Sequence, residues 1–289
     1  MIVRKPTNGI YVGTVKIGDY APVSIQSMIT TDPVHTEKAI AEINHLAEAG
    51  CELVRVAVPT MASAKALKAG SEVNISGGEF KIDSADDSVH SNGNIVITGG
   101  NISVASGDNG MHANGNLTIS DGTVDITKSY EGIEGSIVTI DGGTISVAAS
   151  DDGINCAGGS DTGSTDRMGA DQFSAQEGVE LNINGGTITI DADGDGLDSN
   201  GNFTMAGGTV CVCGPTNGGN GAIDYNGTAT VTGGTLIACG AVGMEEGFGD
   251  NSTQYSVLHD LGSTVSANEK LTITDSDDKE ILSFTPTKT

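Results

Sequence analysis

The chain of 289 residues has no tryptophan, only five phenylalanines and five tyrosines, and only 13 basic residues against 38 acidic ones. A net charge of −25 makes nucleic acid and anionic membranes unsuitable partners, because like charges repel. No segment approaches the roughly 20 consecutive apolar residues of a membrane span. The N-terminal residues lack the apolar segment of a secretion signal. We therefore expect no nucleic-acid partner, no membrane span and, for the chain as given, a cytoplasmic location.

The five cysteines are too few and too irregularly spaced to form a disulfide scaffold in a chain of this length. Cys213 and Cys239 follow consecutive glycine pairs at the same distance. They are close enough in the repeat to form a bridge, although two stacked small residues are the simpler interpretation.

Glycine, in contrast, is abundant, and Gly-Gly or Asp-Gly pairs recur with steps of 22, 22, 21, 43, 22 and 26 residues. Short segments with alternating apolar residues flank each pair, which is the period of a β-strand. Repeats of this length stack into solenoids. The sequence predicts a right-handed parallel β-helix of about seven coils over residues 71–247, with a polar insertion at 159–178 and a C-terminal capping segment with a hairpin at 248–289. The seven pairs are 77–78, 99–100, 121–122, 142–143, 185–186, 207–208 and 233–234.

Three columns of apolar residues are expected to fill the interior, since neighbouring coils lie about 4.8 Å apart. β-Branched residues suit such a narrow core better than aromatic rings do. The column before the glycine pairs is Ile75, Ile97, Ile119, Ile140, Ile183, Met205 and Val231. The column after them is Phe80, Ile102, Val124, Ile145, Ile188, Val210 and Leu236. The third is Val89, Met111, Ile133, Ile154 and Leu197.

An acidic turn follows the second strand of each coil, and stacking brings its carboxylates within about 5 Å of those on the next coil. Such proximity is unfavourable unless a cation intervenes. Oxygen donors suit Ca²⁺, whereas Zn²⁺ prefers His and Cys. We therefore predict Ca²⁺ as the cofactor. One predicted cluster is Asp151, Asp152, Asp193, Asp195 and Asp198, another is Asp86, Asp87, Asp108 and Asn109, and Glu131 lies between them in the column.

Other interpretations of these turn residues remain open. Asp and Asn also favour tight turns through bonds to the backbone. The column of Asn92, Asn114, Asn200 and Asn226 is interpreted as structural. His90 and His112 stack on adjacent coils, where they could bind a metal ion or respond to pH, but we expect them to be half-exposed turn residues.

The first 70 residues lack the glycine pairs and follow a strand–helix–strand–helix pattern, typical of the start of a parallel α/β domain. Three segments, Ile10-Tyr-Val-Gly13, Gln26-Ser27-Met28 and Leu53-Val-Arg-Val-Ala-Val-Pro-Thr-Met61, resemble the 4-hydroxy-3-methylbut-2-enyl diphosphate synthase family. That resemblance implies a fragment of a TIM barrel, with Gln26, Ser27 and Arg55 near a substrate diphosphate. The cysteines and the glutamate that hold the family's iron–sulfur cluster have no counterpart, so we expect no such cluster and no synthase activity. The predicted helix at 60–68 could cap the first coil.

Residues 72–285 resemble a second family, the secreted calcium-binding β-helix proteins called carbohydrate-binding domain-containing. The segments that carry it are Gly194-Asp-Gly-Leu-Asp-Ser-Asn-Gly201, Gly214-Pro-Thr-Asn-Gly-Gly-Asn-Gly-Ala-Ile-Asp224 and Gly233-Gly-Thr-Leu-Ile-Ala238. Some members bind polygalacturonate. The resemblance implies an extracellular or cell-surface location and an acidic polysaccharide as partner.

Together these patterns favour a non-catalytic, calcium-dependent binder of acidic, pectic polysaccharide. The absence of tryptophan agrees, because sugar-stacking platforms use exposed rings. A calcium-dependent polysaccharide lyase is an alternative, and it would need a basic residue to remove a proton. Arg167 is the one candidate, since the other basic residues between 71 and 250 are the scattered Lys81 and Lys128. A synthase, inferred from the N-terminal resemblance alone, and a purely structural solenoid are the remaining alternatives.

Overall fold

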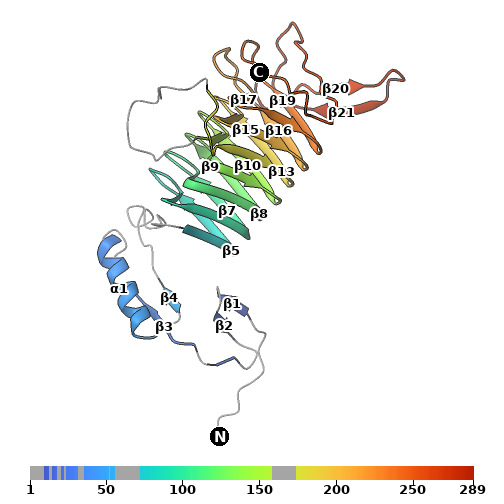
Figure 1. Ribbon diagram of the computed structural model, residues 1–289. Helices are drawn as coiled ribbons and strands as arrows, with labels where there is room; N and C mark the ends of the chain where they lie inside the picture. Colours follow the sequence, from blue (N-terminus) through green and yellow to red (C-terminus); the bar gives the residue numbers. More distant parts are fainter. Residues whose placement is uncertain are drawn as a thin grey trace. The chain divides into compact units, whose positions relative to one another are not determined.

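The computed structural model describes residues 10–12, 15–17, 21–22, 24–31, 36–51, 53–55, 72–157 and 174–289. The chain divides into two units, Met1–Ala66 and Leu67–Thr289. Among the described residues, no helix is both long and apolar enough to cross a membrane. Figure 1 shows the helix and strands of both units.

The first unit contains short strands and one helix. Strands β1 (Ile10–Val12) and β2 (Val15–Ile17) pair antiparallel. Strands β3 (Gln26–Met28) and β4 (Leu53–Arg55) pair parallel, and helix α1 (Thr36–Glu48) lies between them in the chain. The Glu42 carboxylate accepts hydrogen bonds of 2.9 Å from the backbone N–H groups of Thr30 and Thr31, which ties the end of β3 to α1. This strand–helix–strand order agrees with the TIM-barrel-like fragment, whereas the predicted helix at 60–68 lies outside the described residues.

The second unit is a parallel β-solenoid of about seven turns, as the glycine spacing predicts (Figure 1). The strands of the early coils are β5 (Glu72–Asp83), β6 (Val89–Ser91), β7 (Asn94–Ala105), β8 (Met111–Ser129), β9 (Ile133–Ile140), β10 (Thr144–Ala149) and β11 (Ile154–Cys156). Those of the later coils are β12 (Glu180–Ile183), β13 (Thr187–Ala192), β14 (Leu197–Ser199), β15 (Asn202–Met205), β16 (Thr209–Cys213), β17 (Ile223–Tyr225), β18 (Ala229–Val231) and β19 (Thr235–Cys239). Strands β20 (Leu271–Thr274) and β21 (Glu280–Phe284) form the expected C-terminal antiparallel hairpin.

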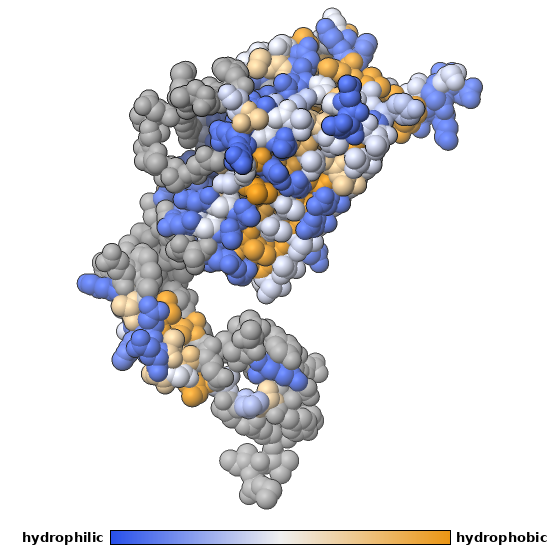
Figure 2. Space-filling view, viewed as in Figure 1, coloured by the Kyte–Doolittle hydropathy of each residue, from blue (hydrophilic) through white to orange (hydrophobic). Residues whose placement is uncertain are grey.

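All three predicted core columns pair in the expected register. The first runs from Ile75 to Val231 and the second from Phe80 to Leu236 through consecutive parallel partners. The third begins at Val89 and continues one coil beyond the prediction, to Ile223. Most of these side chains are fully buried in one continuous apolar cluster. Hydrophilic residues occur along the whole length of the solenoid face seen in Figure 2.

The second glycine of each pair explains why the corners must be glycine. Its φ angle is positive at all seven corners, between 85° and 104°, in the left-handed region that residues with a Cβ rarely adopt.

Two other features of the repeat follow from the register. Cys213 and Cys239 are register partners and remain thiols. The Asn226 amide donates a 3.0 Å hydrogen bond to Asn200 Oδ1, so the Asn column does link coils.

At the first coil, the end of the core is hollow among the described residues. A cavity of about 140 Å³ lies there, lined by apolar side chains that include Val73, Phe80 and Ile102. Solenoids expose core at their terminal coils in this way unless a cap covers it.

Candidate metal centres

Two columns of polar residues run along one corner of the solenoid. At this corner the strands that follow the glycine pairs turn into the strands of the third core column, which we call the third ladder. In the turn itself, successive backbone groups bond from coil to coil. Ser88 N donates to Asn109 O, Gly110 N to Glu131 O, Gly132 N to Asp152 O, and Gly153 N to Asp195 O. The turn residues grouped in the sequence therefore stack in register.

Some turn carboxylates also perform the structural role that the sequence allows. Asp87 Oδ1 accepts a 3.1 Å hydrogen bond from Asn109 N, and Asp152 Oδ1 accepts one of 2.7 Å from Asp195 N. Asp195 Oδ1 in turn accepts one from Gly221 N. In each of these carboxylates the backbone N–H groups contact Oδ1, and the Oδ2 of Asp87 contacts His90 instead.

The second polar column lies on the outer face of the third ladder. Its register partners are, in order, His90, His112, Glu134, Asn155, Asp198 and Asp224. The last of these, Asp224, was not assigned to a site from the sequence. Extra residues between Gly208 and Asp224, which lengthen this step to 26 residues, obscured its equivalence to Asp198, although the strings Gly-Leu-Asp198 and Ala-Ile-Asp224 correspond.

The two columns meet in a cluster that we call the carboxylate centre, consisting of Asp152, Asp195 and Asp198. One oxygen from each lies within 4.8 Å of the others. Burial, together with repulsion from Asp151 and Asp195, raises the pKa of Asp152 to about 8. Burial also raises the pKa of Asp195 to about 6, and burial with repulsion from Asp152 raises the pKa of Asp198 well above its ordinary value. Ionising all three carboxyl groups together is therefore unfavourable in the absence of a cation.

The surrounding residues extend this negative field. Glu131 repels both Asp152 and Asp198 electrostatically, and Asp224 repels Asp195 and Asp198. Glu246, which the sequence did not indicate, adds its charge beside Asp195 and Asp224. Asn155 stands next to Asp198 in the column, is 8% exposed, and has no hydrogen-bond partner for its Oδ1 among the described residues.

Asp193 belongs to a different arrangement. Its carboxylate lies 3.0 Å from Lys288 Nζ and is 68% exposed. Strand β13 ends at Ala192, so Asp193 and Asp195 lie in the turn, where side chains two residues apart need not share a face. The carboxylate centre therefore forms without Asp193.

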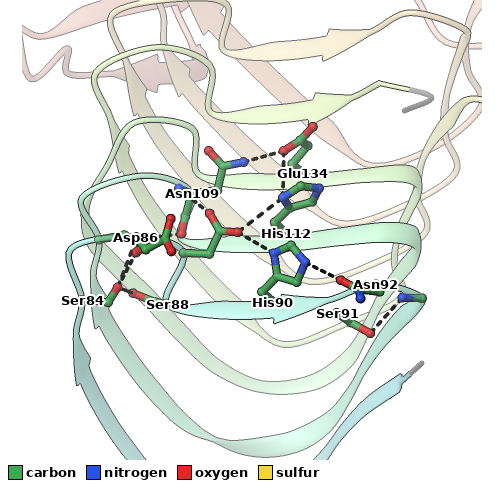
Figure 3. A network of polar contacts seen from close by, with 12 residues as sticks. Ser84, Asp86, Ser88, His90, Ser91, Asn92, Asn109, His112 and Glu134 are labelled. Atoms are coloured by element: carbon green, nitrogen blue, oxygen red, sulfur yellow. Dashed lines mark hydrogen bonds and ion pairs between the residues drawn. The ribbon is translucent and has the colours of Figure 1, made fainter. Parts of the chain in front are cut away.

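The second predicted cluster separates into two overlapping groups. Asp86, Asp87 and Asp108 have carboxylate oxygens within 4.8 Å of one another, as do donor atoms of Asp87, His90 and His112. Asn109, predicted to join the carboxylates, donates through its side-chain amide to Glu134 (Figure 3), and its buried Oδ1 has no hydrogen-bond partner among the described residues. We call Asp87, His90, His112 and Glu134 the histidine centre.

The expectation that the histidines are half-exposed is wrong. His90 is 6% exposed and His112 is 1% exposed. His90 Nδ1 lies 2.5 Å from Asp87 Oδ2, and the two ring centroids are 4.7 Å apart. Burial opposes ionisation of Asp87, yet the adjacent His112 and His90 rings hold its pKa well below the usual range.

The residues assigned to a diphosphate site lie in the first unit. Gln26 and Ser27 are on β3, where Gln26 is exposed and Ser27 is half-buried. Arg55 is on β4, and its register partner is Met28. Their part in diphosphate binding stays a prediction, and Arg167, the candidate lyase base, lies outside the described residues.

Comparisons with known proteins match two parts of the chain to two different family models. Residues 7–101 match the model of the GcpE TIM-barrel domain, and residues 111–218 match that of the family described as carbohydrate-binding domain-containing protein. No solved structure gives a significant match.

Three curated relatives are named 4-hydroxy-3-methylbut-2-en-1-yl diphosphate synthase (flavodoxin). The protein of Thermodesulfovibrio yellowstonii is 54% identical over 67 residues, that of Sulfurihydrogenibium sp. 52% over 68, and that of Idiomarina loihiensis 48% over 67. The matched segment covers 23–24% of this chain but only 18–19% of those relatives. The chain thus joins a short stretch similar to the synthases with a solenoid whose central coils are similar to carbohydrate-binding domain-containing proteins.

Proposed function

We propose that this protein is a non-catalytic binder of acidic polysaccharide of the polygalacturonate type, and that Ca²⁺ at the carboxylate centre mediates binding. The observation that carries the proposal is the convergence of Asp152, Asp195 and Asp198 within 4.8 Å. The match to the carbohydrate-binding domain family, residues 111–218, spans all three. On this proposal the protein acts outside the cell or at its surface, where such polymers occur.

The donor set fits calcium chemically. Ca²⁺ takes six to eight oxygen ligands in flexible geometry. The three carboxylates and the unpartnered Asn155 Oδ1 supply oxygen, and no thiol or imidazole belongs to this centre as the structure describes it. Protons held by the raised pKa values of Asp152 and Asp195 would leave on binding, since metal ligands must be deprotonated.

A bound Ca²⁺ ion would also allow an acidic protein to bind an acidic polymer. With a net charge of −25, direct contact with uronate carboxylates would be repulsive. An ion held by three protein carboxylates has coordination positions left for oxygens of the polymer. Specificity for carboxylated sugars then follows from the ion, with no requirement for aromatic platforms.

Catalysis is less well supported by the described residues. Lys81 and Lys128 are exposed on strands β5 and β8, and neither is a neighbour of the carboxylate centre. A lyase would need a base close to the bound uronate. Likewise, a TIM barrel needs eight parallel strands, and the described part of the first unit contains the parallel pair β3 and β4.

Retention on immobilised polygalacturonate, with Ca²⁺ or with a chelator, tests this function. Methyl-esterified pectin is the matched polymer control, because its carboxylates are blocked. Asp198→Asn removes one charge on β14 without altering the strand's backbone bonds, and Asp125→Asn, on another face of the solenoid, is the control variant. We expect the chelator and Asp198→Asn to abolish retention and Asp125→Asn to preserve it. Retention that survives chelation, or that is equal on esterified pectin, would refute the proposal, and ultraviolet-absorbing unsaturated products would identify a lyase instead.

A further inference from the structure

The histidine centre in the early coils has a chemistry that calcium and polysaccharide binding do not use. Its donor atoms come from the turn before β6, from β6 itself, from β8 and from β9 (Figure 3). We propose that Asp87, His90, His112 and Glu134 form a binding site for a divalent transition metal ion of the zinc class.

Two separations between donor atoms match the edge of a tetrahedral site. His112 Nδ1 lies 3.4 Å from Asp87 Oδ2 and 3.6 Å from Glu134 Oε2. Ligands bound to zinc at about 2.0–2.1 Å stand about 3.4 Å apart across a tetrahedral edge. The contact between His90 Nδ1 and Asp87 Oδ2, at 2.5 Å, is shorter because a hydrogen occupies it. Replacing that hydrogen with the ion requires the pair to separate by about 1 Å.

The surroundings of His112 are an independent sign that this site binds a ligand. The ring is 1% exposed, and neither Nδ1 nor Nε2 has a hydrogen-bond partner among the described residues. Nδ1 instead faces the space between two carboxylates at distances longer than a good hydrogen bond. A histidine kept in the core only for packing would satisfy its nitrogens, because buried polar groups without partners are unfavourable.

Neighbouring residues form hydrogen bonds with the proposed ligands and fix their orientation. His90 Nε2 lies 3.0 Å from Asn92 Oδ1. Because an amide oxygen only accepts, Nε2 carries the hydrogen and Nδ1 is the nitrogen that can bind a metal. Asn109 holds both carboxylates, since its backbone N–H donates to Asp87 Oδ1 and its side-chain amide donates to Glu134 Oε2.

The donor types distinguish this centre from the carboxylate centre. Two imidazoles and two carboxylates suit zinc and its neighbours, whereas Ca²⁺ prefers oxygen alone. Asp87 then belongs to the histidine centre, although Asp86 and Asp108 lie near it. Asn155 separates Glu134 from Asp198 in the polar column, so the two centres use different coils.

Zinc titration of the full-length, chelator-stripped protein, monitored by calorimetry, tests the site in the presence of excess Ca²⁺. Co²⁺ serves as a second probe, because its visible absorption reports tetrahedral coordination. We expect one equivalent of zinc to bind and calcium not to displace it. His112→Gln should weaken binding more than about 100-fold, since loss of an outer-shell partner alone costs 10–100-fold.

Two further variants make the result decisive. Asn92→Ala removes the partner of His90 and should weaken zinc binding by about 10–100-fold, which keeps the test valid if His112→Gln fails to fold. His259→Gln alters an exposed histidine in the C-terminal segment and should leave zinc binding unchanged. Absence of stoichiometric zinc binding, an octahedral cobalt spectrum, or equal losses in His112→Gln and His259→Gln would overturn the proposal. None of these outcomes depends on retention by polygalacturonate, so the zinc proposal and the polysaccharide proposal can be refuted independently of each other.

Discussion

Replacing Asp152 with asparagine is predicted to stabilise the metal-free protein, against the general tendency of substitutions in a buried cluster. The pKa of Asp152 is raised from 3.8 to about 8 by burial and by repulsion from Asp151 and Asp195. The folded state therefore holds this proton more tightly than the unfolded state does. The contribution to stability is fully present below about pH 4 and is lost as the pH rises towards 8.

The magnitude follows from the width of that pH window. Each pH unit between the unfolded and folded pKa values lowers the free energy of unfolding by about 1.4 kcal/mol. From 3.8 to pH 7 the loss reaches about 4 kcal/mol at most. An asparagine side chain at this position would never ionise, and its Oδ1 can still accept the hydrogen bond from Asp195 N. Asp152→Asn should thus exceed the parent in stability by up to about 4 kcal/mol at pH 7 and match it near pH 4.

The assay is urea denaturation with a chelator present, followed by circular dichroism because the chain has no tryptophan. Midpoints are compared instead of extrapolated free energies, since solenoids depart from two-state unfolding. Asp125→Asn is the control and should shift the midpoint little at any pH. With saturating Ca²⁺ the order should reverse, because the parent gains stability from bound metal. A difference between Asp152→Asn and the parent that does not grow with pH would refute the inferred charge repulsion.

Three other perturbations test the architecture. Gly132→Ala would place a Cβ against the carbonyl oxygen of Gly153 on the next coil, so we expect a large loss of thermal stability, measured by melting. Ile119→Ala removes a fully buried side chain from the first core column and should cost about 2–5 kcal/mol, whereas Ile273→Ala, at a position 49% exposed, should cost far less in the same urea assay. Deletion of residues 1–66 should leave the solenoid's melting temperature nearly unchanged, since its continuous core begins at Ile75; a fall of more than a few degrees would contradict the division into two units.

The repeat made the core predictable but not the details of the turns. A period of about 22 residues specifies which side chains stack, and the columns through Ile119 and Val124 followed from it with the correct register. The period does not specify how a turn folds over its neighbours. For this reason the burial of His90 and His112 was missed, and the longer step before Asp224 concealed its place in the polar column.

Alternation along a strand also has a limit where the chain turns. Asp193 and Asp195 are two residues apart, which would place both on one face of a regular strand. Strand β13 ends at Ala192, however, and the side chains beyond it follow the turn. Asp195 consequently reaches the carboxylate centre, whereas Asp193 contacts Lys288 from the C-terminal end of the chain.

The boundary between the two parts of the chain lies before the first coil. The GcpE match extends to residue 101, but the curated relatives align over only 67–69 residues. Strands β5 and β7 pair parallel over Glu72–Asp83, with Ile75 opposite Ile97 and Phe80 opposite Ile102. Consecutive strands of a TIM barrel are each followed by a helix, whereas these two belong to adjacent coils. Structurally, therefore, the barrel-like stretch ends before residue 72.

The polar column shows how a solenoid can place two chemistries on one scaffold. Its backbone is the same at each coil, so the ligand set at any level depends on one side chain from that coil and on the turn beside it. The order His90, His112, Glu134 offers nitrogen and oxygen, while Asp198 and Asp224 offer oxygen alone. Asn155, which lies between Glu134 and Asp198, supplies a neutral oxygen to the carboxylate centre and adds no charge that would merge the two sets. Exchanging Asn155 for aspartate should accordingly couple the centres, so that zinc binding in the early coils weakens calcium binding in the later ones.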